Sequence, residues 1–340
     1  MVDKKLKVCI DRVLPQEVFR NQPVRRSRGG VSRAVFEFRK MWINGSTLRV
    51  RFMGGTDSEQ RIAREQAAWW IQHANLKFDF NDAPDAEIRI AFDSNDGAWS
   101  WVGTDSKRIP QNDPTMNLGF LDGGTAAHEF GHAIGLGHEH QNPEGGIEWN
   151  EDVVVRDLSG PPNNWNDAQI RHNVLRKYRT DQIRGTKFDG DSIMLYFFPP
   201  SWTKDGKGTK ANEILSSMDT AFIASEHAYP KTEVAAVELE VNAERSTRAS
   251  IGTPGEEDLF TFTADRAGRY IVATRGSTDV VMKLFGPDSQ TQLIAEDDDS
   301  GVGLNARIVA DLIPGVYYAQ IRHYYKATGT GNYTIRVRRE

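Results

Sequence analysis

The sequence predicts an α+β domain over residues 41–230 and an all-β sandwich over residues 231–340. In the first part, strand-like and helical segments lead to a histidine-rich helix. Beyond Tyr229 and Pro230, helical periodicity ends and short alternating segments follow, separated by Gly, Asp and Pro. A length of 340 residues also favours two domains. Residues 1–40 are expected to form a separate N-terminal segment.

The α+β domain is predicted to begin with a strand at Leu48–Phe52, where apolar and charged residues alternate. Two glycines end this strand. Asp57 or Ser58 can then cap a helix that runs to about His73. Three further strands are expected at Lys77–Phe80, Glu87–Phe92 and Met116–Phe120.

The segment HEFGHAIGLGH, which starts at His128, carries the most specific signal in the chain. On a helix, His128 and His132 lie on one face and can bind one ion. Gly135 can adopt the left-handed conformation that ends a helix, and the turn would bring His138 as a third ligand. Three histidines leave one zinc position open for water, which is typical of catalytic sites. Glu129 is expected to hold and deprotonate that water.

A chance match in a charged helix and a zinc-binding but inactive relative are the alternatives. The match continues through Gly135 and His138, and Glu129 is present, which favours the catalytic interpretation. Cobalt or manganese could fit the site, but three imidazoles favour zinc.

The full HExxHxxGxxH pattern resembles the signature of the metzincin metallopeptidases, whose other hallmark is a methionine-bearing turn. SIMLY, Ser192 to Tyr196, matches such a turn. Taken with HEFGHAIGLGHEH, it most resembles the astacin family, with the matrixins as second choice. The resemblance implies a metzincin domain with a mixed twisted sheet and long helices. It also implies a zinc metalloendopeptidase that cleaves proteins by attack of a Glu-activated, zinc-bound water.

The same resemblance gives three further residues a role. Met194 would form the hydrophobic floor under the metal. Tyr196 would ligate zinc at rest and swing to stabilise the oxyanion, and Glu139 would meet a newly freed N-terminus. Leu195 departs from the family pattern, which has His in the turn, and a single cysteine cannot form the astacin disulfides.

Protein or peptide substrates are expected to bind in an extended conformation. In metzincins, the strand before the zinc helix is a sheet edge that pairs with the substrate backbone, so the resemblance implies this role for Met116–Phe120. An ordinary internal strand is the alternative. Two non-protease interpretations also remain: a catalytically weak zinc-binding protein for adhesion or substrate binding, and a hydrolase of a non-protein amide.

Composition limits the partners. A net charge of −5 gives no indication of a nucleic-acid or polyanion partner, and no apolar stretch reaches the length of a membrane span. A monomer is expected. The start, MVDKKLKVCID, lacks the apolar core and cleavage site of a secretory signal. The resemblance nevertheless favours a secreted protein; a cytoplasmic protein or non-classical export is the alternative.

Cys9 is the single cysteine, so it cannot form an internal disulfide. Its thiolate could occupy the open zinc position and keep the enzyme latent, because thiolates bind zinc well. The alternative is an incidental thiol. Residues 1–40 could then be a prosegment, or a solvated arm.

The C-terminal region is predicted to contain six strands, at Leu259–Ala264, Arg269–Arg275, Val280–Pro287, Ala306–Leu312, Val316–Tyr324 and Asn332–Arg338. Their order resembles the bacterial pre-peptidase C-terminal domain, a module that follows many secreted peptidases. The acidic run from Glu296 to Asp299 could chelate Ca²⁺ through oxygen ligands. A solvated acidic turn is the alternative.

Overall fold

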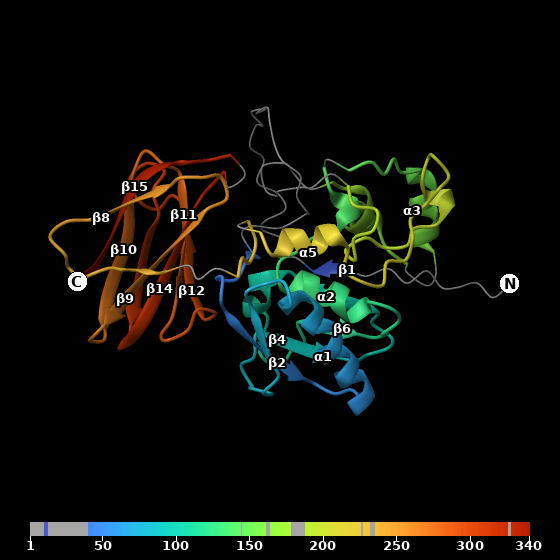
Figure 1. The fold of residues 1–340 in the computed structure, drawn as a ribbon, viewed down its shortest axis with the longest axis horizontal. Coiled ribbons are helices and arrows are strands. Elements are labelled where there is room, and N and C mark those ends of the chain that lie inside the picture. The colour runs from blue at the N-terminus through green and yellow to red at the C-terminus, as the bar shows by residue number, and fades with distance from the viewer. Residues whose placement is uncertain are drawn as a thin grey trace. The chain divides into compact units, whose positions relative to one another are not determined.

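The computed structural model describes the chain in eight stretches: residues 10–12, 40–143, 145–160, 164–177, 188–225, 227–231, 235–325 and 328–340. Cys9, and all of residues 1–40 except Ile10–Arg12 and Lys40, lie outside the described residues. The chain forms two compact units (Figure 1). The first comprises Met1–Met41, Leu48–Ala74 and Phe78–Ala224; the second comprises Trp42–Thr47, Asn75–Lys77 and Ser225–Glu340.

The first unit is built on a six-stranded mixed sheet with the order β1-β5-β6-β4-β2-β3. Its strands are β1 (Ile10–Arg12), β2 (Thr47–Phe52), β3 (Lys77–Asp79), β4 (Ile88–Ala91), β5 (Ala98–Trp101) and β6 (Met116–Leu118). β2, β4 and β6 are parallel neighbours, and β5 pairs antiparallel with β6. β1 pairs parallel with the other side of β5. The α+β class with a mixed sheet is confirmed.

The expected edge strand is wrong. β6, at Met116–Leu118, lies inside the sheet because β4 pairs on one side of it and β5 on the other. β5 was not predicted from the sequence. Its first three residues, Ala98, Trp99 and Ser100, are all buried, so they show none of the alternation by which a half-exposed strand is recognised.

Helix α1 (Asp57–Ile71) is capped by Thr56 rather than by Asp57 or Ser58. Thr56 and Glu59 form a capping box, in which each side chain binds the other residue's backbone N–H. Along α1, Gln66 and Trp70 face α2 (Thr125–Ala133). Gln66 accepts a hydrogen bond from the Ala127 amide at 3.0 Å, and the Trp70 indole donates to the Ala127 carbonyl at 2.7 Å. α1 therefore fixes the start of α2.

The remaining helices of this unit are short: η3 (Gly103–Arg108), η4 (Glu139–Gln141), α3 (Glu151–Ser159), α4 (Asp167–Ile170), the π-helix η5 (Arg171–Leu175), η6 (Pro200–Trp202) and α5 (Ser217–Ile223). α3, α4 and η5 bury apolar side chains in a core with the segment from Leu195 to Trp202. None of the helices that the structure describes is long and apolar enough to cross a membrane.

The second unit is a sandwich of two sheets with the orders β13-β10-β15-β8 and β12-β11-β14-β9-β7. Its strands are β7 (Val237–Glu238), β8 (Thr247–Ile251), β9 (Glu257–Ala264), β10 (Gly268–Gly276), β11 (Val280–Phe285), β12 (Leu293–Asp297), β13 (Arg307–Leu312), β14 (Gly315–His323) and β15 (Gly331–Arg339). All six predicted strands are present. β7, β8 and β12 were missed.

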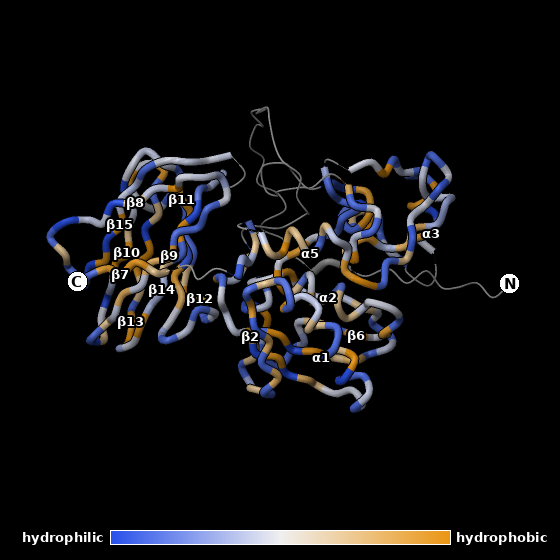
Figure 2. The backbone as a smooth tube through the Cα atoms, viewed as in Figure 1, coloured by the Kyte–Doolittle hydropathy of each residue, from blue (hydrophilic) through white to orange (hydrophobic). Residues whose placement is uncertain are grey.

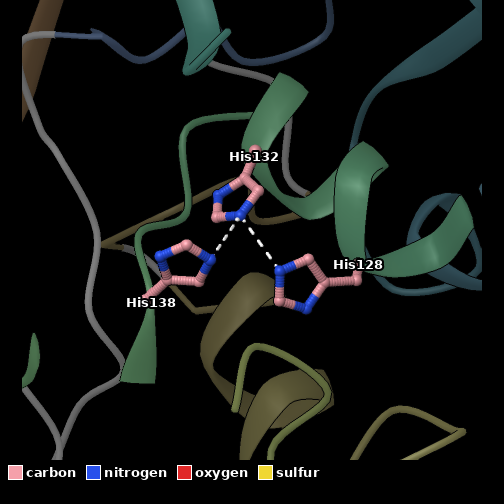
Figure 3. Close-up of side chains that lie close together, drawn as sticks. All are labelled: His128, His132 and His138. Atoms are coloured by element: carbon pink, nitrogen blue, oxygen red, sulfur yellow. Dashed lines mark hydrogen bonds between the residues drawn. The ribbon is translucent and has the colours of Figure 1, made fainter. Parts of the chain in front are cut away.

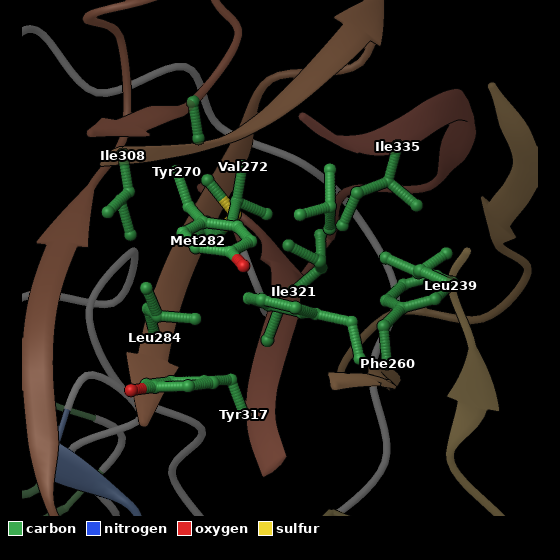
Figure 4. Close-up of a cluster of buried hydrophobic side chains, with 14 of the residues drawn as sticks. Leu239, Phe260, Tyr270, Val272, Met282, Leu284, Ile308, Tyr317, Ile321 and Ile335 are labelled. Atoms are coloured by element: carbon green, nitrogen blue, oxygen red, sulfur yellow. The ribbon is translucent and has the colours of Figure 1, made fainter. Parts of the chain in front are cut away.

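Apolar side chains from both sheets meet in the sandwich core (Figure 4). Phe262 and Tyr317 stack there, with ring centroids 5.5 Å apart. Along the backbone trace, hydrophobic and hydrophilic residues are mixed within the strands of the sandwich (Figure 2), because one side of each strand faces the core and the other does not.

Candidate active site

Helix α2 carries the motif, and its end places the third histidine. The helix stops at Ala133, and Gly135 then adopts a φ of +107°, a conformation that favours glycine. The Gly135 amide donates to the His132 carbonyl at 2.8 Å, which closes the turn. The chain then reverses, so His138 reaches the helix face that bears His128 and His132, as the motif predicts.

The three imidazoles form a buried cluster (Figure 3). The Nε2 atom of His132 lies 3.1 Å from Nε2 of His128 and 3.1 Å from Nε2 of His138. The Nδ1–H of His128 donates to the Ile193 carbonyl at 2.7 Å, and that of His132 donates to the Leu136 carbonyl at 2.7 Å. A proton on Nδ1 leaves the Nε2 lone pair of each ring directed at the centre of the cluster.

This donor set fits zinc. Zinc–nitrogen bonds of about 2.0–2.1 Å in tetrahedral geometry place ligand nitrogens roughly 3.3 Å apart. The observed Nε2 separations of 3.1 Å are close to that spacing. Among the residues that the structure describes, no other group of three His, Cys, Asp or Glu side chains offers ligand atoms this close together.

Of two further predicted residues, Tyr196 lies at the cluster and Glu129 is next to the first ligand in the sequence. Glu129 follows the first ligand on α2 and is fully buried. The Tyr196 hydroxyl lies 3.1 Å from Nε2 of His128 and also within hydrogen-bond distance of Nε2 of His138. A phenol therefore lies beside the imidazoles, and a buried carboxylate follows the first of them on the helix.

Met194 lies under α2, where a glycine makes room for it. A Cβ atom added at Gly131 would lie 2.5 Å from the Met194 sulfur and 3.0 Å from the Trp70 ring. Such distances are too short for carbon and sulfur atoms in contact. Glycine at this position of the motif therefore allows Met194 to pack directly against the helix backbone between the two histidine ligands.

The turn that bears Met194 is held by a buried carboxylate. Asp219, in the first turn of α5, accepts hydrogen bonds from the Ser192 hydroxyl at 2.7 Å and the Ile193 amide at 2.9 Å. The Met194 amide donates to the Ser192 hydroxyl at 3.0 Å. The Met194 carbonyl accepts from the Glu139 amide at 3.0 Å, so the turn is also tied to the segment that carries His138.

The chain was compared with known protein families and proteins. The model of the astacin peptidase family matches residues 35–209, just over half of the chain. This chain belongs to the astacin family. It is 24% identical over 187 residues to the Caenorhabditis elegans protein "Zinc metalloproteinase nas-30", and 27% identical over 159 residues to "Astacin-like metalloprotease toxin 1" of Loxosceles intermedia. These matches cover 54% and 46% of this chain, but only 22% of the worm protein and 54% of the spider protein.

Among solved structures, myroilysin is 33% identical to the chain, with a TM-score of 0.56; the match covers 59% of this chain and all of that one. The second unit is similar to the pre-peptidase C-terminal domain of a Bacillus anthracis collagenase, with 17% identity and a TM-score of 0.28. That match covers 32% of this chain and 98% of that one. The sandwich fold itself is established by the strand pairing of the second unit.

Glu139 of this astacin-family chain is buried behind the Met194 turn. Its carboxylate accepts hydrogen bonds from the Asp189 amide and the Asn142 side chain, both at 2.9 Å. Burial nevertheless raises the pKa of Glu139 to about 8. A positive charge brought next to this carboxylate would therefore stabilise its ionised form.

His140 is a residue near the site that the sequence analysis missed. It is buried, its ring lies 4.9 Å from that of His138 and 5.0 Å from that of Phe198, and its Nε2–H donates to the Asn173 carbonyl at 2.9 Å. This bond ties the third ligand's neighbourhood to the π-helix η5. The sequence His-Glu-His after Gly137 shows a second histidine two residues after the third ligand. Nothing in the sequence distinguishes a histidine that packs in the core from one that binds the metal.

The acidic run in the second unit is used within its own loop. The Asp297 carboxylate accepts hydrogen bonds from the Ser300 amide at 3.2 Å and the Arg307 amide at 2.7 Å. These bonds support the alternative of an acidic turn. The calcium prediction stays a prediction.

Proposed function

We propose that this chain is a zinc-dependent endopeptidase that cleaves peptide bonds in proteins. The observation that supports this most directly is the buried set of His128, His132 and His138, with Glu129 on the same helix and the Tyr196 hydroxyl beside it. Membership of a family of zinc metalloendopeptidases supports the same reaction.

The three imidazoles would hold the zinc. Bound there, zinc supplies Lewis acidity and makes water a good nucleophile near neutral pH. Glu129 accepts the proton of the attacking water and passes it to the leaving amine as the peptide bond breaks. The Tyr196 hydroxyl donates a hydrogen bond to the carbonyl oxygen as that oxygen becomes negatively charged. Met194 holds the floor of the site.

The substrate backbone is proposed to pair with β5, the strand antiparallel to β6. Ile10, Asp11 and Arg12 of β1 are in register with Trp99, Ser100 and Trp101 along this edge. A substrate strand would have to take the place of β1. We therefore propose that residues 1–40 act as a prosegment. Cys9, next to β1 in sequence, would contribute to latency if its thiolate reaches the zinc position.

Release of the prosegment would create a new N-terminal amine. Glu139, whose burial favours its neutral form, is proposed to receive that amine and become ionised. A secreted location, as the family resemblance favours, is part of the same proposal.

The test is cleavage of casein by purified chain beside Glu129→Ala, Glu129→Gln and a chelator-treated sample, with the N-terminus of the active species sequenced. We expect both variants to retain one zinc per chain and to lose nearly all turnover. Full turnover in Glu129→Ala would exclude the proposed base. Casein left intact by wild-type chain with residues 1–40 removed, although zinc is bound, would favour the alternative of a zinc-binding adhesion protein.

A further inference from the structure

The outer face of the four-stranded sheet of the sandwich is rich in arginine. Along β10 and β15, alternate side chains are buried in the sandwich core, and the side chains between them face outward. Six outward positions on the four strands are arginines. Arg269 of β10 forms an ion pair with Glu340. We call the other five the arginine face: Arg248 of β8, Arg275 of β10, Arg307 of β13, and Arg336 and Arg338 of β15.

Strand register brings these arginines together. Ala273 of β10 is paired with Arg336 on one side and with Arg307 on the other. Directly paired residues of antiparallel strands point to the same face, and strands lie about 5 Å apart. Arg336 and Arg307 are therefore roughly 10 Å apart across a small alanine. Arg338 lies two residues along β15, about 7 Å further on.

A second row lies beside the first. Thr334 of β15 is paired with Arg275 on one side and with Arg248 on the other. Arg275 and Arg248 therefore flank a small threonine as Arg336 and Arg307 flank an alanine. The two rows place five arginine side chains on one face of the sheet, with Ala273 and Thr334 between the paired arginines.

Asp311 of β13 is the one carboxylate at an outward position of the described strands of this sheet, and it is paired in register with Arg269 rather than with an arginine of the arginine face. Among the described residues, none of the five forms an ion pair with Asp or Glu. Partial burial and the charges of Arg338 and Arg275 lower the pKa of Arg336. Like charges on neighbouring strands destabilise a sheet. The chain as a whole has a net charge of −5, so this cluster of positive charge is confined to one face of the sandwich.

The other outer face of the sandwich is different. Leu259 and Phe285 of the five-stranded sheet point away from the sandwich core and are buried with Ile43, which belongs to the same unit. One outer face is thus apolar and covered. On the other, four of the five arginines are exposed and Arg336 is half-buried.

We propose that the arginine face binds an anionic polysaccharide, one that carries sulfate or carboxylate groups along an extended chain. Each guanidinium can bind such a group through two parallel N–H donors. An open sheet face about 15 Å wide across its four strands matches a polymer that lies across the strands better than a compact ligand that needs a pocket. This site is separate from the histidine cluster, and the inference does not depend on the proposed function.

The side chains between the arginines argue against other polyanions. Besides the arginines, the outward positions of these strands carry Ala, Ser, Thr, Asn, Ile, Val and one Asp, but no aromatic residue. Proteins that bind single-stranded nucleic acids stack bases on aromatic rings. Ile271 and Val309, the two larger apolar residues, are partly buried, so the face lacks the exposed apolar side chains that insert into membranes.

The test is binding of fluorescein-labelled dextran sulfate to the full chain, measured by anisotropy, with neutral dextran and a single-stranded DNA of equal charge as comparisons. The variant is Arg275→Gln/Arg336→Gln/Arg338→Gln. Its matched control is Arg61→Gln/Arg156→Gln/Arg171→Gln, which removes three exposed arginines of the first unit. We expect the first triple variant to bind about tenfold more weakly or worse, with a shallower salt dependence, because fewer counterions are released. The control should bind like wild type.

Equal loss in both triple variants would mean that binding is nonspecific and would overturn the proposal. Wild-type affinity in the first variant, or equal affinity for neutral dextran, would also overturn it. Tighter binding of the DNA than of dextran sulfate would assign the face to nucleic acid instead. If the triple variant unfolds, Arg338→Gln alone should weaken binding about twofold, and an unchanged affinity there would count against the site.

Discussion

The carboxylate of Asp219 is connected to the imidazole of His128 through Ser192 and one peptide group. The Nδ1–H of His128 donates to the Ile193 carbonyl. The N–H of the same peptide group belongs to Met194 and donates to the Ser192 hydroxyl, and that hydroxyl donates to Asp219. All three donors point from the histidine towards the carboxylate, so each bond polarises the next. A negative charge on Asp219 should therefore make the His128 ring a stronger metal ligand.

Replacing Asp219 should weaken metal binding without removing a ligand. Asp219→Asn keeps the size of the side chain but removes its charge, and we expect zinc affinity to fall about tenfold or more. Competition with a coloured chelator measures this directly. Ser192→Ala cuts the same connection while leaving Asp219 bonded to the Ile193 amide, so it should lower affinity too. The exposed Asp191→Asn is the control; unchanged affinity in both test variants would refute the connection.

Tyr196→Phe should slow turnover while the metal stays bound. The phenol oxygen lies beside the ligand nitrogens, where it can donate to a developing oxyanion. Loss of one such donor costs about 10²-fold in kcat or more. Steady-state kinetics should show this fall with KM nearly unchanged, and zinc content should stay at one per chain. A variant with normal kcat would restrict Tyr196 to packing.

Gly131→Ala should destabilise the first unit, because the added methyl group would overlap the Met194 sulfur and crowd Trp70. Overpacking of this kind costs about 1–3 kcal/mol in the free energy of unfolding. Gly146→Ala is the matched control, since a Cβ there meets nothing within 4 Å. Chemical denaturation followed by tryptophan fluorescence compares them. Equal stability of the two variants would show that Met194 can move away from the helix at little cost.

How far the sequence could predict this site depends on where its groups come from. His128, His132, Glu129 and His138 are side chains at fixed spacings on a helix and the turn after it, so their meeting could be predicted. The Ile193 and Leu136 carbonyls orient the rings, but they are backbone atoms. Since every residue has a backbone carbonyl, no residue type in the sequence marks these two.

The position of β6 was predicted wrongly, and the arginine face was not predicted. β6 was expected at the edge because the metzincin resemblance implied it, and no pattern in the sequence revealed β5, whose buried residues on both faces give no alternation. The arginine face was missed because net charge is a sum over the whole chain. Only strand register shows that Arg275 and Arg336, distant in sequence, are diagonal neighbours in one sheet.

The second unit should lose stability as the pH rises through the range where Asp258 ionises. The Tyr333 hydroxyl donates to the Asp258 carboxylate at 2.6 Å, but burial raises the pKa of Asp258 to about 6, above its usual value near 3.9. The folded state therefore binds the proton more tightly than the unfolded chain. This contribution is fully present below about pH 4 and is lost as the pH rises through about 6.

The loss should amount to about 1–2 kcal/mol, after allowance for solvent screening of a half-buried group. Calorimetric unfolding at several pH values should show it as a fall in wild-type stability relative to Asp258→Asn, which keeps an acceptor for Tyr333 and cannot ionise. Asp265→Asn, at an exposed position of the same unit, should follow wild type. The free energies of unfolding of wild type and Asp258→Asn could instead differ by a constant amount from about pH 4 to 7. Asp258 would then titrate alike in the folded and unfolded chain, and burial would not control its ionisation.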